Sequence, residues 1–332
     1  MTVVTGVWAQ DTYYPLTTEG VPPGTIYVAT TGSDDNDGSE NAPVATVGKA
    51  IELALVNNGS GEIIINEGTY VGNGYHVTGD LTVTGNGKVT LDANNEGRLF
   101  YMENGESANK IELHNLILTN ANGYGAAVYS LANELILDKV NIVKNNANGF
   151  LIKSNGKLSI TDSEISESMS GNVIQQDASG DILIKNTVFE DNSIVDNASV
   201  RAVVNINSGS GNMVVENSKF KNNTARQGVI KGNSNYNIEV KGTEFKNNTN
   251  TVSYGGAIYA NGGILNITDC VFDSNKAYRS GGAIYVGYRV TATVDSCIFI
   301  NNTANTAVDE YYGDAIYNGN KLTVTNSAFL GG

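Results

Sequence analysis

The sequence predicts an all-β protein, a single-stranded parallel β-helix of about ten or eleven coils behind a capping helix. A short motif, GGAIY or GDAIY, recurs at Gly255–Tyr259, Gly281–Tyr285 and Gly313–Tyr317, and a strand-like segment follows each copy. No single copy can bury its own apolar face, so neighbouring copies must cover one another. The motif therefore indicates a solenoid.

A large apolar residue recurs along the chain at intervals of 23 to 31 residues, in what we call the aromatic position. Its occupants are Ile117, Ile142, Ile165, Phe189, Phe220, Phe245, Phe272, Phe299 and Phe329. Most of them have an Asn three residues later, and such Asn residues are expected to take the left-handed conformation at a corner and to form a ladder of amides. The period is too short for propeller blades, which need about 40 residues.

We divide the chain into three parts: an N-terminal leader with an edge strand (1–42), a capping helix (43–60) and the β-helix itself (61–332). The helix is predicted because Val47, Ala50, Ile51, Ala54 and Leu55 have the spacing of one apolar helical face. This helix would cover the apolar end of the first coil and its unpaired strand edge.

The leader ends in an acidic loop that could bind calcium. Asp34, Asp35, Asn36 and Asp37 precede Gly38, and calcium prefers six to eight oxygen ligands on a flexible backbone. The Glu that closes an EF-hand loop is missing, and an acidic turn held by its own hydrogen bonds is the alternative. No other cofactor is expected.

Composition excludes several partners. The net charge of −14 argues against nucleic acid and anionic lipid, and no apolar run approaches the ~20 residues of a membrane span.

The two cysteines, Cys270 and Cys297, occupy equivalent positions in adjacent repeats and are expected to stack as free, buried residues. We expect a monomer.

Candidate ligand-binding residues lie next to the three copies of the repeated motif. Equivalent residues of a solenoid superpose, so tyrosines at these places should gather on one side, where exposed rings beside charged groups suit sugars or protein anchors. The alternative is that the rings pack on their own loops. The candidate residues are Tyr254, Tyr278, Arg279, Tyr288, Asp309, Glu310, Tyr311 and Tyr312.

The repeats resemble those of two groups of surface proteins. GGAIY with FxxN, at Gly255–Tyr259 with Phe272–Asn275, resembles the repeats of chlamydial polymorphic membrane proteins and, more closely, those of adhesin-like proteins of methanogenic archaea. The segment Tyr27–Gly38 is similar to the leader of many secreted right-handed β-helix proteins. The resemblance implies a right-handed helix, a cell-surface, extracellular location and binding to a glycan or protein on a host or partner cell. We also expect the chain to be a fragment that lacks stalk or wall-binding domains.

No catalytic motif stands out in the sequence. The two histidines, His76 and His114, lie in no recognisable motif, and Asp269 and Asp295 have the alternation of solvated turn residues. Nucleophile elbows, phosphate loops and zinc spacings are missing. The sequence therefore favours a non-catalytic adhesin with no catalytic residues. A polysaccharide lyase or hydrolase and a passive cell-wall module are the alternatives.

Overall fold

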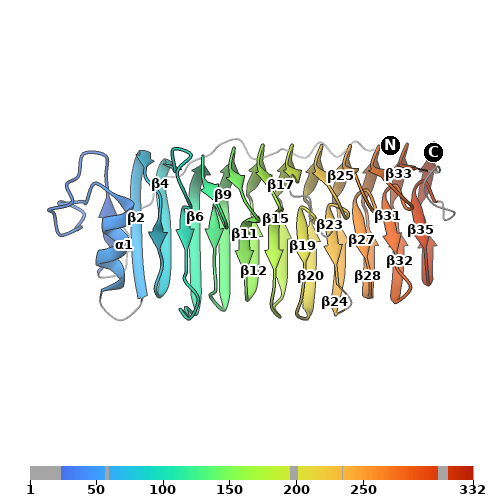
Figure 1. The fold of residues 1–332 in the computed structure, drawn as a ribbon, viewed down its shortest axis with the longest axis horizontal. Coiled ribbons are helices and arrows are strands. Elements are labelled where there is room, and N and C mark those ends of the chain that lie inside the picture. The colour runs from blue at the N-terminus through green and yellow to red at the C-terminus, as the bar shows by residue number, and fades with distance from the viewer. Residues whose placement is uncertain (1–23, 57–59, 195–200, 234, 306–312, 332) are drawn as a thin grey trace.

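The computed structural model describes residues 24–56, 60–194, 201–233, 235–305 and 313–331. In these ranges the chain winds into a straight rod of stacked coils, with one helix at the N-terminal end (Figure 1). The described strands of adjacent coils pair in parallel, with like positions opposite each other, for example Phe245 opposite Phe272 and Tyr259 opposite Tyr285; the register shifts only within the pairs β2–β4 and β4–β6. The predicted right-handed parallel β-helix is confirmed.

Three sheets run along the rod, and we call them A, B and C. Within the described residues sheet C has ten strands and sheet B eight, and sheet A has nineteen because most coils contribute two strands to it. Sheet C consists of β3 (Tyr75–His76), β5 (Phe100–Tyr101), β8 (Val128–Tyr129), β11 (Phe150–Ser154), β15 (Asn172–Gln176), β19 (Val204–Ile206), β23 (Ile230–Gly232), β27 (Ile258–Ala260), β31 (Ile284–Val286) and β35 (Ile316–Asn318). Sheet B consists of β7 (Asn122–Gly123), β10 (Asn146–Ala147), β14 (Met169–Ser170), β18 (Ser193–Ile194), β22 (Thr224–Ala225), β26 (Thr249–Asn250), β30 (Lys276–Ala277) and β34 (Thr303–Ala304).

Sheet A begins with the edge strand β1 and holds the long strands of the first coils. Its strands are β1 (Ile26–Val28), β2 (Ser60–Val71), β4 (Asp80–Asp92), β6 (Lys110–Thr119), β9 (Glu134–Val143), β12 (Lys157–Thr161), β13 (Glu164–Ser166), β16 (Ile182–Lys185), β17 (Val188–Glu190), β20 (Gly211–Glu216), β21 (Lys219–Lys221), β24 (Tyr236–Lys241), β25 (Glu244–Lys246), β28 (Gly263–Thr268), β29 (Val271–Asp273), β32 (Val290–Asp295), β33 (Ile298–Ile300), β36 (Lys321–Thr325) and β37 (Ala328–Leu330). Alternate residues of each strand point inward, so the other half of each strand forms an outer face.

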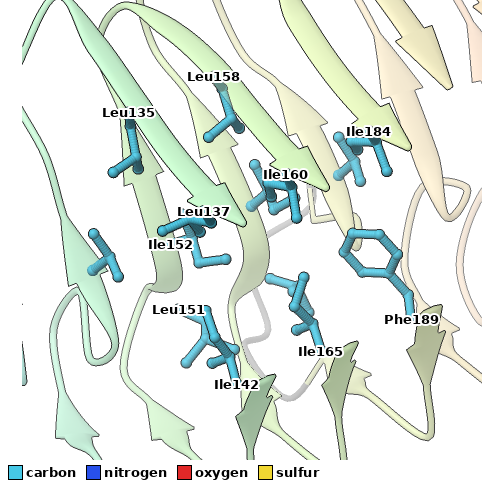
Figure 2. Packing of buried hydrophobic residues seen from close by; sticks show 14 of the residues in the cluster. Leu135, Leu137, Ile142, Leu151, Ile152, Leu158, Ile160, Ile165, Ile184 and Phe189 are labelled. Carbon is cyan, nitrogen blue, oxygen red and sulfur yellow. The ribbon is translucent and has the colours of Figure 1, made fainter. Parts of the chain in front are cut away.

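The interior of the rod is a continuous apolar core. Figure 2 shows its central part, where aliphatic side chains such as Leu137, Ile160 and Ile165 from successive coils pack together and meet Phe189. From Phe189 to Phe329 the aromatic position is a stack of parallel phenylalanine rings, with centroids 4.6 to 5.0 Å apart. The predicted stacking of Phe245, Phe272 and Phe299 is confirmed, and these rings are buried.

One occupant of the aromatic position was assigned wrongly. Leu118, not Ile117, pairs with Ile142, and Leu118 is fully buried whereas Ile117 is only half-buried. The error arose because Asn120 lies three residues after Ile117 and imitates the repeat. Asn120 instead has a φ of 55° and belongs to the neighbouring corner position.

The amide ladder is present, but its residues are not the left-handed ones. Asn192, Asn223, Asn248 and Asn275 each donate from Nδ2 to the Oδ1 of the equivalent Asn in the next coil, at 2.9 to 3.1 Å. Positive φ values occur one residue earlier, for example 53° at Asn222. The left-handed residue turns the chain, and the following Asn points inward, where its buried amide needs partners.

The helix α1 (Val47–Leu55) buries Val47, Ala50, Ile51 and Ala54 against the first coil, as the apolar spacing predicted. Thr46 caps its N-terminus by accepting a hydrogen bond from the Lys49 amide at 3.2 Å.

Cys270 and Cys297 are buried free thiols, as the sequence predicted. In the described part of the chain no helix has the length and apolar character needed to cross a membrane.

Candidate functional site

Four titratable side chains gather on the outer face of sheet A near the helical end of the rod. Glu62 lies on β2, Glu112 and His114 on β6, and Asp138 on β9. Strand alternation places them outside, because their neighbours Ile63, Ile111 and Leu113 are buried in the core. We call these four residues the acid cluster: Glu62, Glu112, His114 and Asp138.

Strand register brings the members of the acid cluster together. Thr82 on β4 pairs with Glu62 on one side and with Glu112 on the other, so the two glutamates share one column two strands apart. His114 pairs directly with Asp138. Strands of a sheet are about 4.8 Å apart, so the backbones of the two glutamates are separated by roughly 10 Å.

His114 lies between two carboxylates. Its Nε2 is 3.1 Å from Oε2 of Glu112, and its Nδ1 is 3.7 Å from Oδ2 of Asp138. The contact with Asp138 is the largest effect on the pKa of His114 and, together with Glu112, it outweighs burial and raises that pKa. The same contact lowers the pKa of Asp138, which also accepts a hydrogen bond from Thr161 Oγ1 at 2.6 Å. The two carboxylates therefore favour the cationic form of His114.

The two glutamates have pKa values shifted in opposite directions. Burial is the main cause that raises the pKa of Glu62, and the charge of Glu112 adds to it. Burial alone would also raise the pKa of Glu112, but hydrogen bonds from Lys110 and His114 outweigh it and lower that pKa. One carboxyl thus tends to keep its proton and the other to lose it, which is how acid and base roles are divided in a site.

No motif in the sequence marks these residues. His114 lies in no recognisable motif, and Glu62, Glu112 and Asp138 were not among the predicted site residues. An alignment of the outward positions of successive strands would have brought the four together, whereas only the inward aromatic position was aligned.

Four of the predicted ligand-binding residues, which we call the tyrosine surface, lie among the described residues: Tyr254, Tyr278, Arg279 and Tyr288. The Tyr254 ring lies 4.5 Å from Tyr285, and Arg279 Nη1 donates to Tyr254 Oη at 3.1 Å. Tyr278 and Tyr288 are 40% and 66% exposed. Tyr254 thus packs on the stack of scaffold tyrosines as well as on Arg279, and Tyr278 and Tyr288 supply the open rings. Asp309, Glu310, Tyr311 and Tyr312 lie outside the described residues.

The predicted calcium loop holds the start of the helix. Oδ1 of Asp34 accepts hydrogen bonds from the amides of Ala45 and Thr46, both at 2.9 Å, and Oδ2 accepts one from Thr46 Oγ1 at 2.8 Å. Asp37 Oδ1 accepts from the Ser39 amide at 2.9 Å. No group of three His, Cys, Asp or Glu within the described ranges is arranged to hold a metal ion. Calcium binding by Asp34, Asp35, Asn36 and Asp37 stays a prediction.

Replacing Asp34 by Ala is expected to lower the free energy of unfolding by about 1 kcal/mol, because three hydrogen bonds at the helix start are lost. Thermal unfolding of Asp34→Ala and of the control Asp35→Ala, whose side chain is exposed, measures this. Equal losses in both variants would contradict the capping role. A rise in the wild-type melting temperature with calcium, lost in both variants, would support the ion site.

The chain was compared with known proteins at three levels. No protein-family model matches it, and neither does any curated protein sequence. Three solved structures match. A pectate lyase is 15% identical with a TM-score of 0.43, and the match covers 91% of this chain and 78% of the other.

The other two matches are similar in extent. A rhamnogalacturonan lyase is 13% identical over 92% of this chain and 87% of its own, with a TM-score of 0.34. The Agl-KA catalytic domain is 15% identical over 92% and 69%, with a TM-score of 0.37. At such identities and TM-scores these matches indicate the β-helix fold alone.

Two expectations change with these findings. The comparisons give no support to the resemblance to chlamydial or archaeal surface proteins. The expectation that the chain is not an enzyme is wrong: the solved structures that share its fold are two lyases and a catalytic domain. The fold thus offers no ground for excluding catalysis, and the acid cluster was overlooked.

Proposed function

We propose that this protein is a polysaccharide-degrading enzyme that hydrolyses glycosidic bonds at the acid cluster. The observation that carries the proposal is the pair Glu62 and Glu112, two carboxyls on one outer face with pKa values shifted apart. Glycoside hydrolysis requires such a pair, one carboxyl to donate a proton and one to accept it.

The roles follow from the pKa directions. Glu62, which tends to keep its proton, donates it to the glycosidic oxygen as the bond breaks. Glu112, which is ionised, takes a proton from water, and the resulting hydroxyl bonds to the anomeric carbon. The backbones are roughly 10 Å apart, a spacing that allows the carboxyls to lie about 6.5–9.5 Å apart with that water between them, as in enzymes that invert the anomeric centre. Proton exchange with solvent then restores both carboxyls.

His114 and Asp138 support this pair. His114 contacts Glu112 through Nε2 and so lowers the pKa of the base, and Asp138 holds the ring from its other side. Both are positioning residues for Glu112. The cation at His114 also lies where it can interact with acidic groups of a bound polymer.

The test is an incubation of the protein with a panel of neutral and acidic polysaccharides. Hydrolysis produces new reducing ends without unsaturated sugars, and both products are measured separately. Unsaturated ends would assign the cluster to elimination and contradict hydrolysis. No new ends from any polymer with the wild-type protein would contradict an enzyme at this site.

The pH dependence of kcat/KM is expected to be bell-shaped with a maximum near pH 4.5, the ordinary pKa of a glutamate. The raised pKa of Glu62 means that its proton is lost, and activity falls, only above that pH. The lowered pKa of Glu112 means that the base is protonated, and activity falls, only below it. A pH–rate profile on the best substrate measures both limbs. An optimum in the alkaline range would contradict the assigned roles.

We also propose that the tyrosine surface at the other end of the rod binds a glycan on a host or microbial cell. The support is the exposure of Tyr278 and Tyr288, together with the contact between Tyr254 and Arg279 in the same part of the rod. An extracellular, monomeric protein fits both proposals, because cell-surface polysaccharides are outside the cell. A glycan array with the wild type and a Tyr278→Ala, Tyr288→Ala double variant tests this. Unchanged binding by the variant would contradict it.

A further inference from the structure

A groove opens on the outer face of sheet C, away from sheet A and its acid cluster. It has a volume of about 420 Å³ and is lined by Arg98, Met102, Glu103, Asn104, Tyr124 and Tyr129. The residues come from two successive coils, because β5 and β8 pair in register and Tyr124 precedes β8 in the same coil. We call it the Arg98 groove.

Aromatic rings fix the guanidinium of Arg98 in this groove. Its Cζ lies 4.1 Å from the ring centroid of Tyr101 and 5.9 Å from that of Tyr129. The Tyr101 ring in turn stacks on His76, with centroids 4.9 Å apart and planes at 10°. A guanidinium placed over an aromatic face keeps its N–H groups directed outward from its edge.

The donors of Arg98 have no carboxylate partner among the described residues. Arg98 contacts the rings of Tyr101 and Tyr129, whereas no ion pair joins it to Glu103, the carboxylate of the same groove. By contrast, the neighbouring cation Lys153 pairs with Asp177 at 3.1 Å. Arg98 is therefore available to pair with a ligand carboxylate, through a two-pronged hydrogen bond.

Tyr124 supplies a flat apolar surface beside that cation. Its ring is 57% exposed and rests edge-on against the buried Phe150, with centroids 4.5 Å apart. Phe150 limits the freedom of the ring, so stacking a ligand on it costs little further entropy. A ring of this kind matches the C–H face of a sugar.

From this geometry we infer that the Arg98 groove binds a sugar acid residue of an oligosaccharide. Arg98 pairs with the carboxylate, Tyr124 stacks on the sugar ring, and Glu103 and Asn104 accept or donate hydrogen bonds to hydroxyls. The groove holds one unpaired cation and one carboxylate, so a polyanion such as nucleic acid does not match it, whereas a single carboxylate among hydroxyls does. The site is separate from the acid cluster and goes beyond the hydrolysis proposed there.

Calorimetric titration with a galacturonic acid trimer and a galactose trimer tests the inference. The acidic trimer is expected to bind with a Kd below about 1 mM and the neutral one at least 10-fold more weakly. Arg98→Gln should weaken binding of the acidic trimer about 10- to 100-fold, and Tyr124→Ala should weaken it severalfold. Arg98→Lys, which keeps the charge but not the planar fork, should fall between Arg98→Gln and the wild type.

Two controls keep the result specific. Lys88→Gln removes an exposed positive charge at the same end of the rod and should bind as the wild type does. Glu62→Gln should also bind normally, so loss of hydrolysis and loss of this site can be told apart. The melting temperature of each variant verifies folding, and the salt dependence of wild-type binding gives a readout that needs no variant.

Several outcomes would overturn the inference. They are no binding of the acidic trimer, equal binding of both trimers, an equal loss in Lys88→Gln and Arg98→Gln, or tighter binding of a Glu-rich peptide than of the acidic trimer. Wild-type binding that is independent of salt would also contradict a charge pair at Arg98.

Discussion

Replacing Glu62 by Gln is expected to reduce the rate of glycosidic-bond hydrolysis by about 10²- to 10⁴-fold. Glutamine has nearly the shape of a protonated glutamate and can still donate a hydrogen bond, but it cannot transfer a proton to the leaving oxygen. The raised pKa of Glu62 favours its protonated form, so near pH 4.5 the substitution changes the charge of the ground state little. The effect should therefore fall on kcat and leave KM within about twofold.

Steady-state kinetics on the best polysaccharide measure this effect. Glu67→Gln is the matched control, because Glu67 lies on the same strand but is exposed and outside the acid cluster. Its kcat should equal that of the wild type. If Glu62→Gln retains full activity, or if both variants lose it equally, Glu62 is not the acid. A leaving group that needs no protonation should restore part of the activity of Glu62→Gln, which a merely misfolded variant would not show.

Replacing Phe245 by Ala is expected to lower the free energy of unfolding by about 3–5 kcal/mol. The ring is fully buried and stacks on Phe220 and on Phe272, with both centroid distances 5.0 Å. Its removal leaves a cavity that both neighbouring coils line, and parallel strands in register cannot shift to fill it. Denaturant unfolding followed by far-ultraviolet circular dichroism measures the loss.

Phe329→Ala is the control for the position in the stack. Phe329 contacts Phe299 at 4.7 Å but is 50% exposed, so its loss should cost less than half as much. Native-state hydrogen exchange should place the extra opening of Phe245→Ala in β21, β25 and β29. Equal destabilisation by the two variants would contradict the role assigned to the buried stack.

The fold could be predicted because its signals repeat. Phe245, Phe272 and Phe299 recur with nearly constant spacing, and each copy supports the interpretation of the next. The prediction was wrong by one residue at Leu118, where two aliphatic residues are adjacent and Asn120 imitates the repeated distance to the corner. A position is thus least certain where neighbouring residues are chemically equivalent.

The acid cluster could not be predicted in the same way. Glu62, Thr82 and Glu112 occupy one column but are separated by 20 and 30 residues, because loops of different length join the first coils. No motif of fixed spacing results. Their opposite pKa shifts also depend on burial and on contacts with His114 and Lys110, which only the folded chain provides. The Arg98 groove is likewise assembled from two coils.

The in-register stacking of identical positions has a consequence for the distance between the two ends of the rod. Each coil contacts mainly the coils directly before and after it, as Phe245 and Phe272 or Ile258 and Ile284 do. Excising one whole repeat from the middle would bring two surfaces of matching shape together and shorten the molecule by a single step of about 4.8 Å. The acid cluster and the tyrosine surface could in this way be moved relative to each other without altering either one.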